Sequence, residues 1–130
     1  MEAPKTSLSA GLAIRSVLLG APAVAAITDR IYPVVSDDQL LPYIAYRRVS
    51  LEQLPAKGHV PGSDTAVVEV ICYSQTYAGS VELAENVRQA LEGRVWKGEG
   101  MTLRSCFLSD SEEIYEGDAW AQRLLFQIKI

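Results

Sequence analysis

Hydrophobic residues near the start of the chain recur with a helical period. They are concentrated between Leu8 and Leu19, with Ser7 before them as a candidate N-cap and Gly20 after them as a stop. Pro22 suits the first position of a further short helical segment over residues 23–27, because no N–H is needed there. The pattern predicts an N-terminal helix with a broad buried face.

A second helix is predicted between Ser80 and Leu91. Leucine, valine and alanine form one stripe along it, while glutamate, asparagine and glutamine cover the opposite side. Ser80 is its candidate N-cap and Gly93 its stop. A helix with such a stripe must cover an apolar surface, which the neighbouring strands can supply.

Four segments have the pattern of strands, at residues 43–49, 66–74, 101–109 and 119–130. The last one alternates over most of its length, with Trp120, Leu124 and Phe126 on one face and Arg123 and Gln127 on the other. This alternation predicts an antiparallel hairpin with one face on a core and one facing solvent or a neighbouring subunit. The segment DSEEIYEGD before it is predicted to be an acidic connection that ends in a turn.

The predicted order is helix, strand, strand, helix, strand, strand, which is typical of the α+β class. We expect a small, mainly antiparallel sheet of about four strands with two helices packed on one face. The 130 residues fit a single domain, 1–130, and no repeat or change in composition divides them. Residues 50–65, with two prolines and two glycines, are predicted to be a long loop or arm, and such a loop is uncommon in a small domain unless it has a function.

Composition and charge narrow the function classes. Hydrophobic residues make up 48% and charged residues 22%, as in folded globular proteins. A net charge of -4 disfavours a domain whose work is to neutralise phosphates. Within LPYIAYRRVS, the adjacent Arg47 and Arg48 must point to opposite faces of a strand, which argues against a joint grip on one phosphate. We expect no specific nucleic-acid binding.

The apolar run LAIRSVLLGAPAVAAI near the N-terminus is interrupted by Arg15 and is too short to span a bilayer. We interpret it as part of the fold, neither a targeting segment nor a membrane anchor.

Groups that could perform catalysis are few. His59 is the sole histidine and lies in the predicted loop without a second metal ligand at suitable spacing. Cys72 and Cys106 fall in predicted strands, so we expect inert buried thiols and a reducing compartment. The carboxylates at 37–38 and 110–116 lack the alternating spacing of a calcium loop. These observations argue against an enzyme and against a metal site.

One alternative is a ligand-binding or enzymatic α+β domain with a pocket lined by Tyr43, Tyr46, His59 and Tyr73. Stabilisation against heat by a small metabolite would favour this alternative.

A row of arginines is a further possibility. Arg47, Arg104 and Arg123 would line one sheet face if their strands pair, because cross-strand neighbours come within contact distance. Such a row suits ion pairs with an acidic partner at an interface as well as it suits phosphate.

Several segments, taken in order, resemble the tail-completion proteins of tailed bacteriophages and prophages, also described as tail-terminator or head-tail joining proteins. The segments are DRIYP (29–33), LPYIAY (41–46), VEVICYS (68–74), VELAENVRQALEG (81–93) and WAQRLLFQIKI (120–130). The resemblance covers nearly the whole chain. It implies an α+β structural virion protein without catalysis or cofactor, located in the tail or neck and in the host cytoplasm during assembly. It also implies a homo-oligomeric ring, typically a hexamer, that contacts the tail-tube protein and head-tail connector proteins.

Together, resemblance and pattern give the candidate contacts with a neighbouring subunit or the tail tube: Arg47, Arg48, Lys57, His59, Arg104 and Arg123. We expect the loop to reach such a partner, and deletion of residues 57–63 would test this. Trp120 and Phe126 are expected to be core residues, so Trp120→Ala should impair folding before it impairs a contact.

Overall fold

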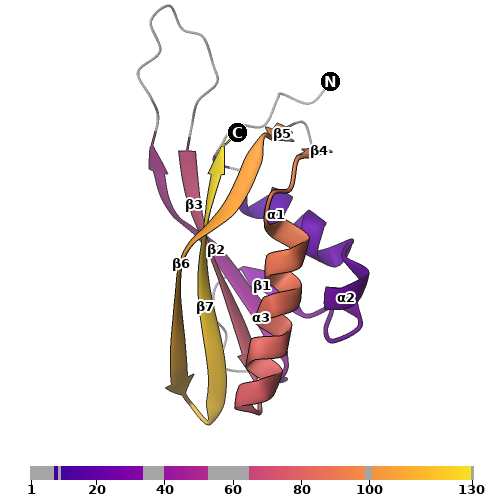
Figure 1. Cartoon of the computed structure of the whole chain (residues 1–130), viewed down its shortest axis with the longest axis vertical. Helices are drawn as coiled ribbons and strands as arrows, with labels where there is room; N and C mark the ends of the chain where they lie inside the picture. Colours follow the sequence, from indigo (N-terminus) through magenta and orange to yellow (C-terminus); the bar gives the residue numbers. More distant parts are fainter. Residues whose placement is uncertain (1–7, 9, 34–39, 53–64, 99–100, 130) are drawn as a thin grey trace, which may run out of the picture.

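A computed structural model describes residues 8, 10–33, 40–52, 65–98 and 101–129 of the chain. Its elements in chain order are α1 (Ala10–Leu19), α2 (Pro22–Ala25), β1 (Ile31–Pro33), β2 (Tyr43–Glu52), β3 (Thr65–Ser74), α3 (Tyr77–Leu91), β4 (Trp96–Gly98), β5 (Met101–Leu103), β6 (Ser105–Glu116) and β7 (Ala119–Lys129). The three helices lie on the same side of a long twisted sheet (Figure 1). The predicted α+β class is confirmed.

The main sheet has five strands in the order β1-β2-β3-β7-β6, and β4 and β5 form a separate two-stranded sheet. All pairings in the main sheet are antiparallel except that of β1 with β2. The expected count of about four strands and two helices was therefore wrong. β1 spans three residues and ends at Pro33, so it is too short to show a period of two and contains a residue that is unfavourable in strands.

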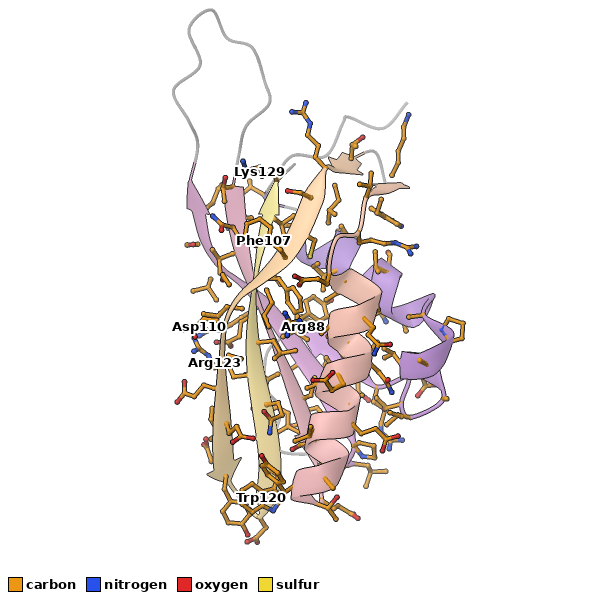
Figure 2. The ribbon with its side chains drawn as sticks, in the orientation of Figure 1. Arg88, Phe107, Asp110, Trp120, Arg123 and Lys129 are labelled. Atoms are coloured by element: carbon orange, nitrogen blue, oxygen red, sulfur yellow. The ribbon has the colours of Figure 1, made fainter. Side chains whose placement is uncertain are left out.

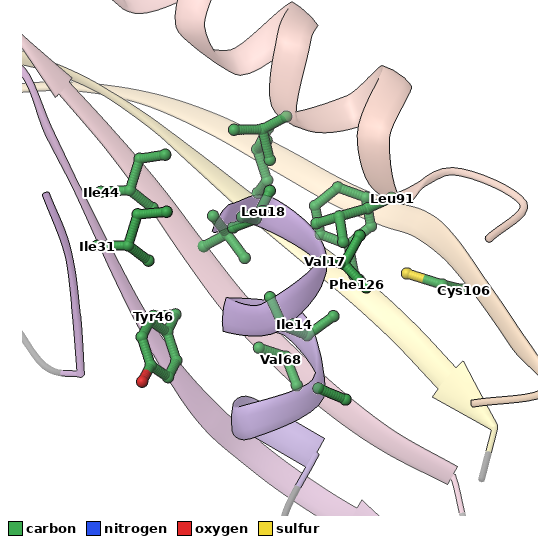
Figure 3. Close-up of a cluster of buried hydrophobic side chains, with 14 of the residues drawn as sticks. Ile14, Val17, Leu18, Ile31, Ile44, Tyr46, Val68, Leu91, Cys106 and Phe126 are labelled. Carbon is green, nitrogen blue, oxygen red and sulfur yellow. The ribbon is translucent and has the colours of Figure 1, made fainter. Parts of the chain in front are cut away.

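The core lies between the helices and the sheet. Phe126 of β7 is fully buried there, as predicted, and packs among apolar side chains of α1, α3 and the neighbouring strands (Figure 3). Full burial of one such side chain stabilises a fold by about 1.5–3 kcal/mol. Cys72 and Cys106 are also buried and free, as expected.

Trp120 was expected to lie in the core, but this expectation was wrong. Its side chain is only partly buried near the start of β7. There its ring contacts Tyr77 edge-on at 5.3 Å and Tyr115 at 4.8 Å between ring centroids. Figure 2 shows it near the tip of the β6–β7 hairpin, beside the lower end of α3. Alternation along β7 gave the correct face for this residue, but the core does not extend to that end of the strand.

α3 begins three residues before the predicted N-cap. Thr76 is the cap, and its hydroxyl accepts a hydrogen bond from the amide of Gly79 at 2.9 Å. The predicted cap, Ser80, is instead fully buried inside the helix and donates to the carbonyl of Tyr77 at 2.7 Å. A Cβ at Gly79, in the first turn of α3, would lie 2.4 Å from Oγ of Ser74 and 2.8 Å from Oγ1 of Thr76, so a larger residue there would displace the capping hydroxyl.

The acidic segment 110–116 was predicted to be a connection, but it forms the second half of β6. β6 pairs with β7 along its length, and Gly117 and Asp118 make the hairpin turn with φ angles of 60° and 62°. Acidic residues are unusual in strands, but most of these carboxylates are exposed on an edge strand, where charge prevents unwanted pairing.

Several sequence-based predictions fall outside the described residues. They concern Ser7, the carboxylates at 37–38, and most of the predicted loop, including Lys57 and His59. Within the ranges given above, no helix has the length and apolar character needed to cross a membrane.

Candidate interaction surfaces

The face of the sheet opposite the helices carries a row of four charged side chains. We call it the open sheet face and define its centre as Arg47, Glu69, Arg123 and Glu112, which come from β2, β3, β7 and β6 in that order across the sheet. Figure 2 shows Arg123 on the side of the sheet away from α3. Each charge thus has a neighbour of opposite sign on an adjacent strand.

Glu69 is the centre of this row. Nε of Arg47 donates to its Oε1 at 3.0 Å, and Nε of Arg123 donates to its Oε2. Arg123 also contacts Glu112, with 3.4 Å between Nη1 and Oε2. The side chain of Glu69 is 5% exposed, whereas those of Arg47 and Arg123 are 57% and 27% exposed. The two arginines therefore cover the carboxylate and keep part of their own surface available to a partner.

The electrostatics of Glu69 follow from this arrangement. Burial by itself raises the pKa of the Glu69 carboxyl, but the hydrogen bonds and charges of Arg47 and Arg123 outweigh burial and hold the pKa below its ordinary value. The hydrogen bond to Glu69 in turn raises the pKa of Arg123. Glu69 is therefore ionised at neutral pH.

Three tyrosines extend the open sheet face toward β1. The rings of Tyr43 and Tyr73 are stacked with centroids 4.6 Å apart, and Tyr32 lies 6.3 Å from Tyr43. Burial, the neighbouring Tyr43 and the charge of Glu116 raise the pKa of Tyr73 to about 12. The Tyr73 phenol is therefore neutral. Tyr32 and Tyr73 are partly exposed on this face, whereas Tyr43 is buried.

The alternative pocket is not formed by these tyrosines. Tyr46 belongs to the core cluster on the helix side, whereas Tyr43 and Tyr73 lie on the open sheet face, so the three do not line one cavity. The physical reason is the period of two along β2, which separates positions 43 and 46 onto opposite faces. His59 lies outside the described residues.

A shallow depression of about 360 Å³ lies where α1 meets the edge of the sheet. We call it the arginine-rimmed depression, and its lining residues are Leu8, Gly11, Leu12, Pro33, Tyr46, Arg47 and Arg48. Leu8 and Leu12 are 65% and 46% exposed. Its lining thus combines apolar side chains with two arginines, a mixture that is also typical of protein interfaces.

The predicted contact residues have different positions. Arg47 and Arg48 lie on opposite faces of β2, as predicted, because Arg47 is opposite Glu69 and Arg48 is opposite the core residue Val68. Arg47 and Arg123 share one face, but Arg104 does not join their row. The amide of Arg104 donates to the carbonyl of Lys129 at 2.7 Å, which places it at the far end of β7.

The sequence did not lead us to predict that Glu69 is the centre of the charged row, or that Leu8 and Leu12 line a depression. A signal existed for Glu69, since it is the only charge in the apolar run AVVEVICYS. A lone charge in a central strand must be paired to be buried. The exposure of Leu8 and Leu12 depends on how α1 packs, which the helical period alone does not determine.

The described residues include carboxylates and two cysteines, the groups that often bind metals or act as nucleophiles. They contain no group of three or more potential metal ligands. Burial, together with the charge of Glu92, raises the pKa of Cys106 to about 12, and burial raises the pKa of Cys72 further, so neither thiol is a ready nucleophile. Fold and surface together define a small α+β domain with apolar and charged surfaces of the kind that proteins use to bind one another.

The chain belongs to the family described as "Tail completion protein gp17", whose sequence profile matches residues 12–130. The resemblance found in the sequence is thereby confirmed. The family consists of structural, non-enzymatic components of phage-like virions, in agreement with the expectation that the chain is not an enzyme. None of the curated proteins compared with the chain matches it.

The same fold occurs in a solved structure described as "Virion of native gene transfer agent (GTA) particle". One chain of that particle superposes with a TM-score of 0.77 and 16% sequence identity, over 96% of this chain and 98% of the other. The helices and both sheets of the present chain thus belong to an architecture that is found in a virion.

Proposed function

We propose that this tail completion protein caps the end of the tail tube as a homo-oligomeric ring, typically a hexamer, and joins the tail to the head or neck. The observation that carries the proposal is the family match across residues 12–130. The shared fold with a chain of a gene transfer agent particle supports it.

The surfaces of the subunit suit a ring. A closed ring is built from head-to-tail contacts, so each subunit needs two different surfaces that fit each other. The arginine-rimmed depression lies at the β1–β2 edge of the sheet, and β6 forms the opposite edge. On the open sheet face between them, Arg47 and Arg123 are partly exposed and are proposed to meet the tail-tube protein or a connector protein.

The candidate contacts keep their roles within this proposal. Arg47, Arg48 and Arg123 belong to the two surfaces just described, while Arg104 is exposed at the far end of β7. Lys57 and His59 are proposed contacts of the 50–65 segment with a neighbouring subunit or the tail tube. The protein works in the virion after assembly in the host cytoplasm.

Removal of the gene tests the proposal. In a phage or prophage that lacks the gene for this chain, we expect heads and tails to accumulate separately, and the wild-type gene supplied from a plasmid should restore tailed particles. Negative-stain micrographs give the ratio of joined to separate structures. Normal tailed particles in the absence of the gene would contradict the proposal.

A further inference from the structure

We propose that the arginine-rimmed depression of one subunit binds the acidic edge strand β6 of a second copy of this chain. The inference rests on the proposed ring and specifies which two surfaces of the subunit meet in it.

Opposite charges gather on the two edges of the sheet. Near the depression, Arg15 and Arg48 are exposed, and neither makes an ion pair with another described residue. At the other edge, the segment 105–118 contains five carboxylates and no lysine or arginine. Asp110 and Glu116 are exposed and likewise have no ion-pair partner among the described residues. One edge is thus basic and the other acidic, as a head-to-tail contact requires.

Apolar side chains accompany the charges on both edges. Leu8 and Leu12 line the depression and Val49 is exposed beside Arg48. β6 exposes Phe107 and Tyr115. Aromatic residues that insert into an apolar depression with a charged rim commonly supply much of the binding energy of an interface.

The backbone also favours contact at these edges. β6 is an edge strand. Its carbonyl at Cys106 accepts from Gly93 and its amide at Leu108 donates to Glu92, so the open part of its edge lies beyond Leu108. On the other side β1 reaches β2 only as far as Tyr46, so within the described part of the chain β2 pairs with β3 alone from its next residue onward. Unpaired strand edges readily accept another strand. The carboxylates of β6 would repel a second β6, which leaves the basic edge as the favoured surface on another copy.

The positions of the two edges allow the same contact to repeat from one subunit to the next. The two edges lie at opposite ends of the strand order, so one subunit can offer its depression to one neighbour and its β6 to the other. Contacts of this head-to-tail kind propagate and close into a ring when the rotation between subunits permits.

Charge reversal tests the contact in assembled particles. We would compare Arg15→Glu/Arg48→Glu, Asp110→Lys/Glu116→Lys, and a chain with all four substitutions in the complementation assay described above. Each double variant places like charges together and should reduce joined particles by at least about tenfold, whereas the fourfold variant restores opposite charges and should recover a substantial part of the loss. Arg88→Glu and Glu85→Lys, at exposed positions of α3, which packs mainly on β3 and β7, are the matched controls. Melting curves of all variants verify that the fold is retained.

A second measurement identifies the partner. Cys72 and Cys106 are buried, so cysteines placed at Arg48 and Glu116 are the reactive thiols for a short bismaleimide cross-linker. In assembled tails the double-cysteine chain should give a ladder of dimers, trimers and higher species, and each single-cysteine chain should give none. Cross-links to a different tail protein, or no ladder in tails that contain the protein, would overturn the inference and leave the proposed ring intact. Absence of any oligomer on the tail would instead refute the proposed function.

Discussion

Substitution of Glu69 by glutamine removes the charge at the centre of the open sheet face while the shape of the side chain is nearly preserved. Glutamine can accept a hydrogen bond from one arginine, but its amide group then faces the N–H donors of the other. The carboxylate is 5% exposed and has contacts with Arg47 and Arg123, so both charge-assisted hydrogen bonds weaken together.

The expected loss of stability depends on how exposed the two arginines that bind Glu69 are. Breaking a fully buried ion pair costs about 3–5 kcal/mol. Arg47 is 57% exposed and can regain water, and Arg123 keeps its contact with Glu112, so we expect a smaller loss of about 2 kcal/mol in the free energy of unfolding. With an unfolding entropy of roughly 2.1 cal/mol/K per residue, this corresponds to a decrease in Tm of about 7 °C for 130 residues.

Urea unfolding at several pH values, followed by tryptophan fluorescence, is the assay. Because the folded-state pKa of Glu69 is lowered, the unfolded chain binds more protons near that pKa, and the stabilising effect of the carboxylate is complete above its ordinary pKa of about 4.5. The effect is lost as the pH falls through the lower folded-state pKa. The difference between wild type and Glu69→Gln should therefore be large at pH 7 and shrink in acid.

Glu112→Gln is the matched control. Its side chain is 60% exposed and its contact with Arg123 is 3.4 Å long, so it should cost about 0–1 kcal/mol. Equal stability of Glu69→Gln and Glu112→Gln, or a difference from wild type that does not change with pH, would refute this account of the open sheet face.

Three further predictions concern the fold. Phe126→Ala should cost about 3–5 kcal/mol in chemical denaturation and Trp120→Ala clearly less, because only Phe126 is fully buried; the opposite order would contradict the assigned core. Thr76→Ala should lower stability by about 1 kcal/mol through loss of the α3 cap, whereas exposed Thr102→Ala should have little effect on the same urea curves. Cys72 and Cys106 should react with a thiol reagent at neutral pH only after unfolding in urea, and rapid labelling of the native protein would show that their burial is assigned incorrectly.

The elements with a long, regular period were predictable from the sequence. The apolar stripes of α1 and α3 and the alternation along β7 depend on residues that are close in sequence, and the structure places them nearly where expected. The second half of β6 was missed because acidic residues are unfavourable in strands by local preference. Its pairing with β7, including Arg123 opposite Glu112, overrides that preference.

The surfaces were only partly predictable. The alternation of side chains along β2 correctly predicts that Arg47 and Arg48 lie on opposite faces, because this inference depends only on neighbouring residues and needs no tertiary structure. The row through Glu69 depends on the registers of β2 and β7 against β3, and these join residues 22 and 54 positions apart. The arginine-rimmed depression depends on the docking of α1 beside β2, which no local pattern specifies.

The central claim is that this chain forms a closed ring where the tail tube ends and the head is joined. Cryo-electron microscopy of purified tailed particles that carry an epitope-tagged copy tests it most directly. The claim predicts a closed ring of copies, with the tag decorating only the head-proximal end of the tail and the depression of each subunit against β6 of the next. Tag density along the tail, in the head, or from a single copy per particle would contradict it.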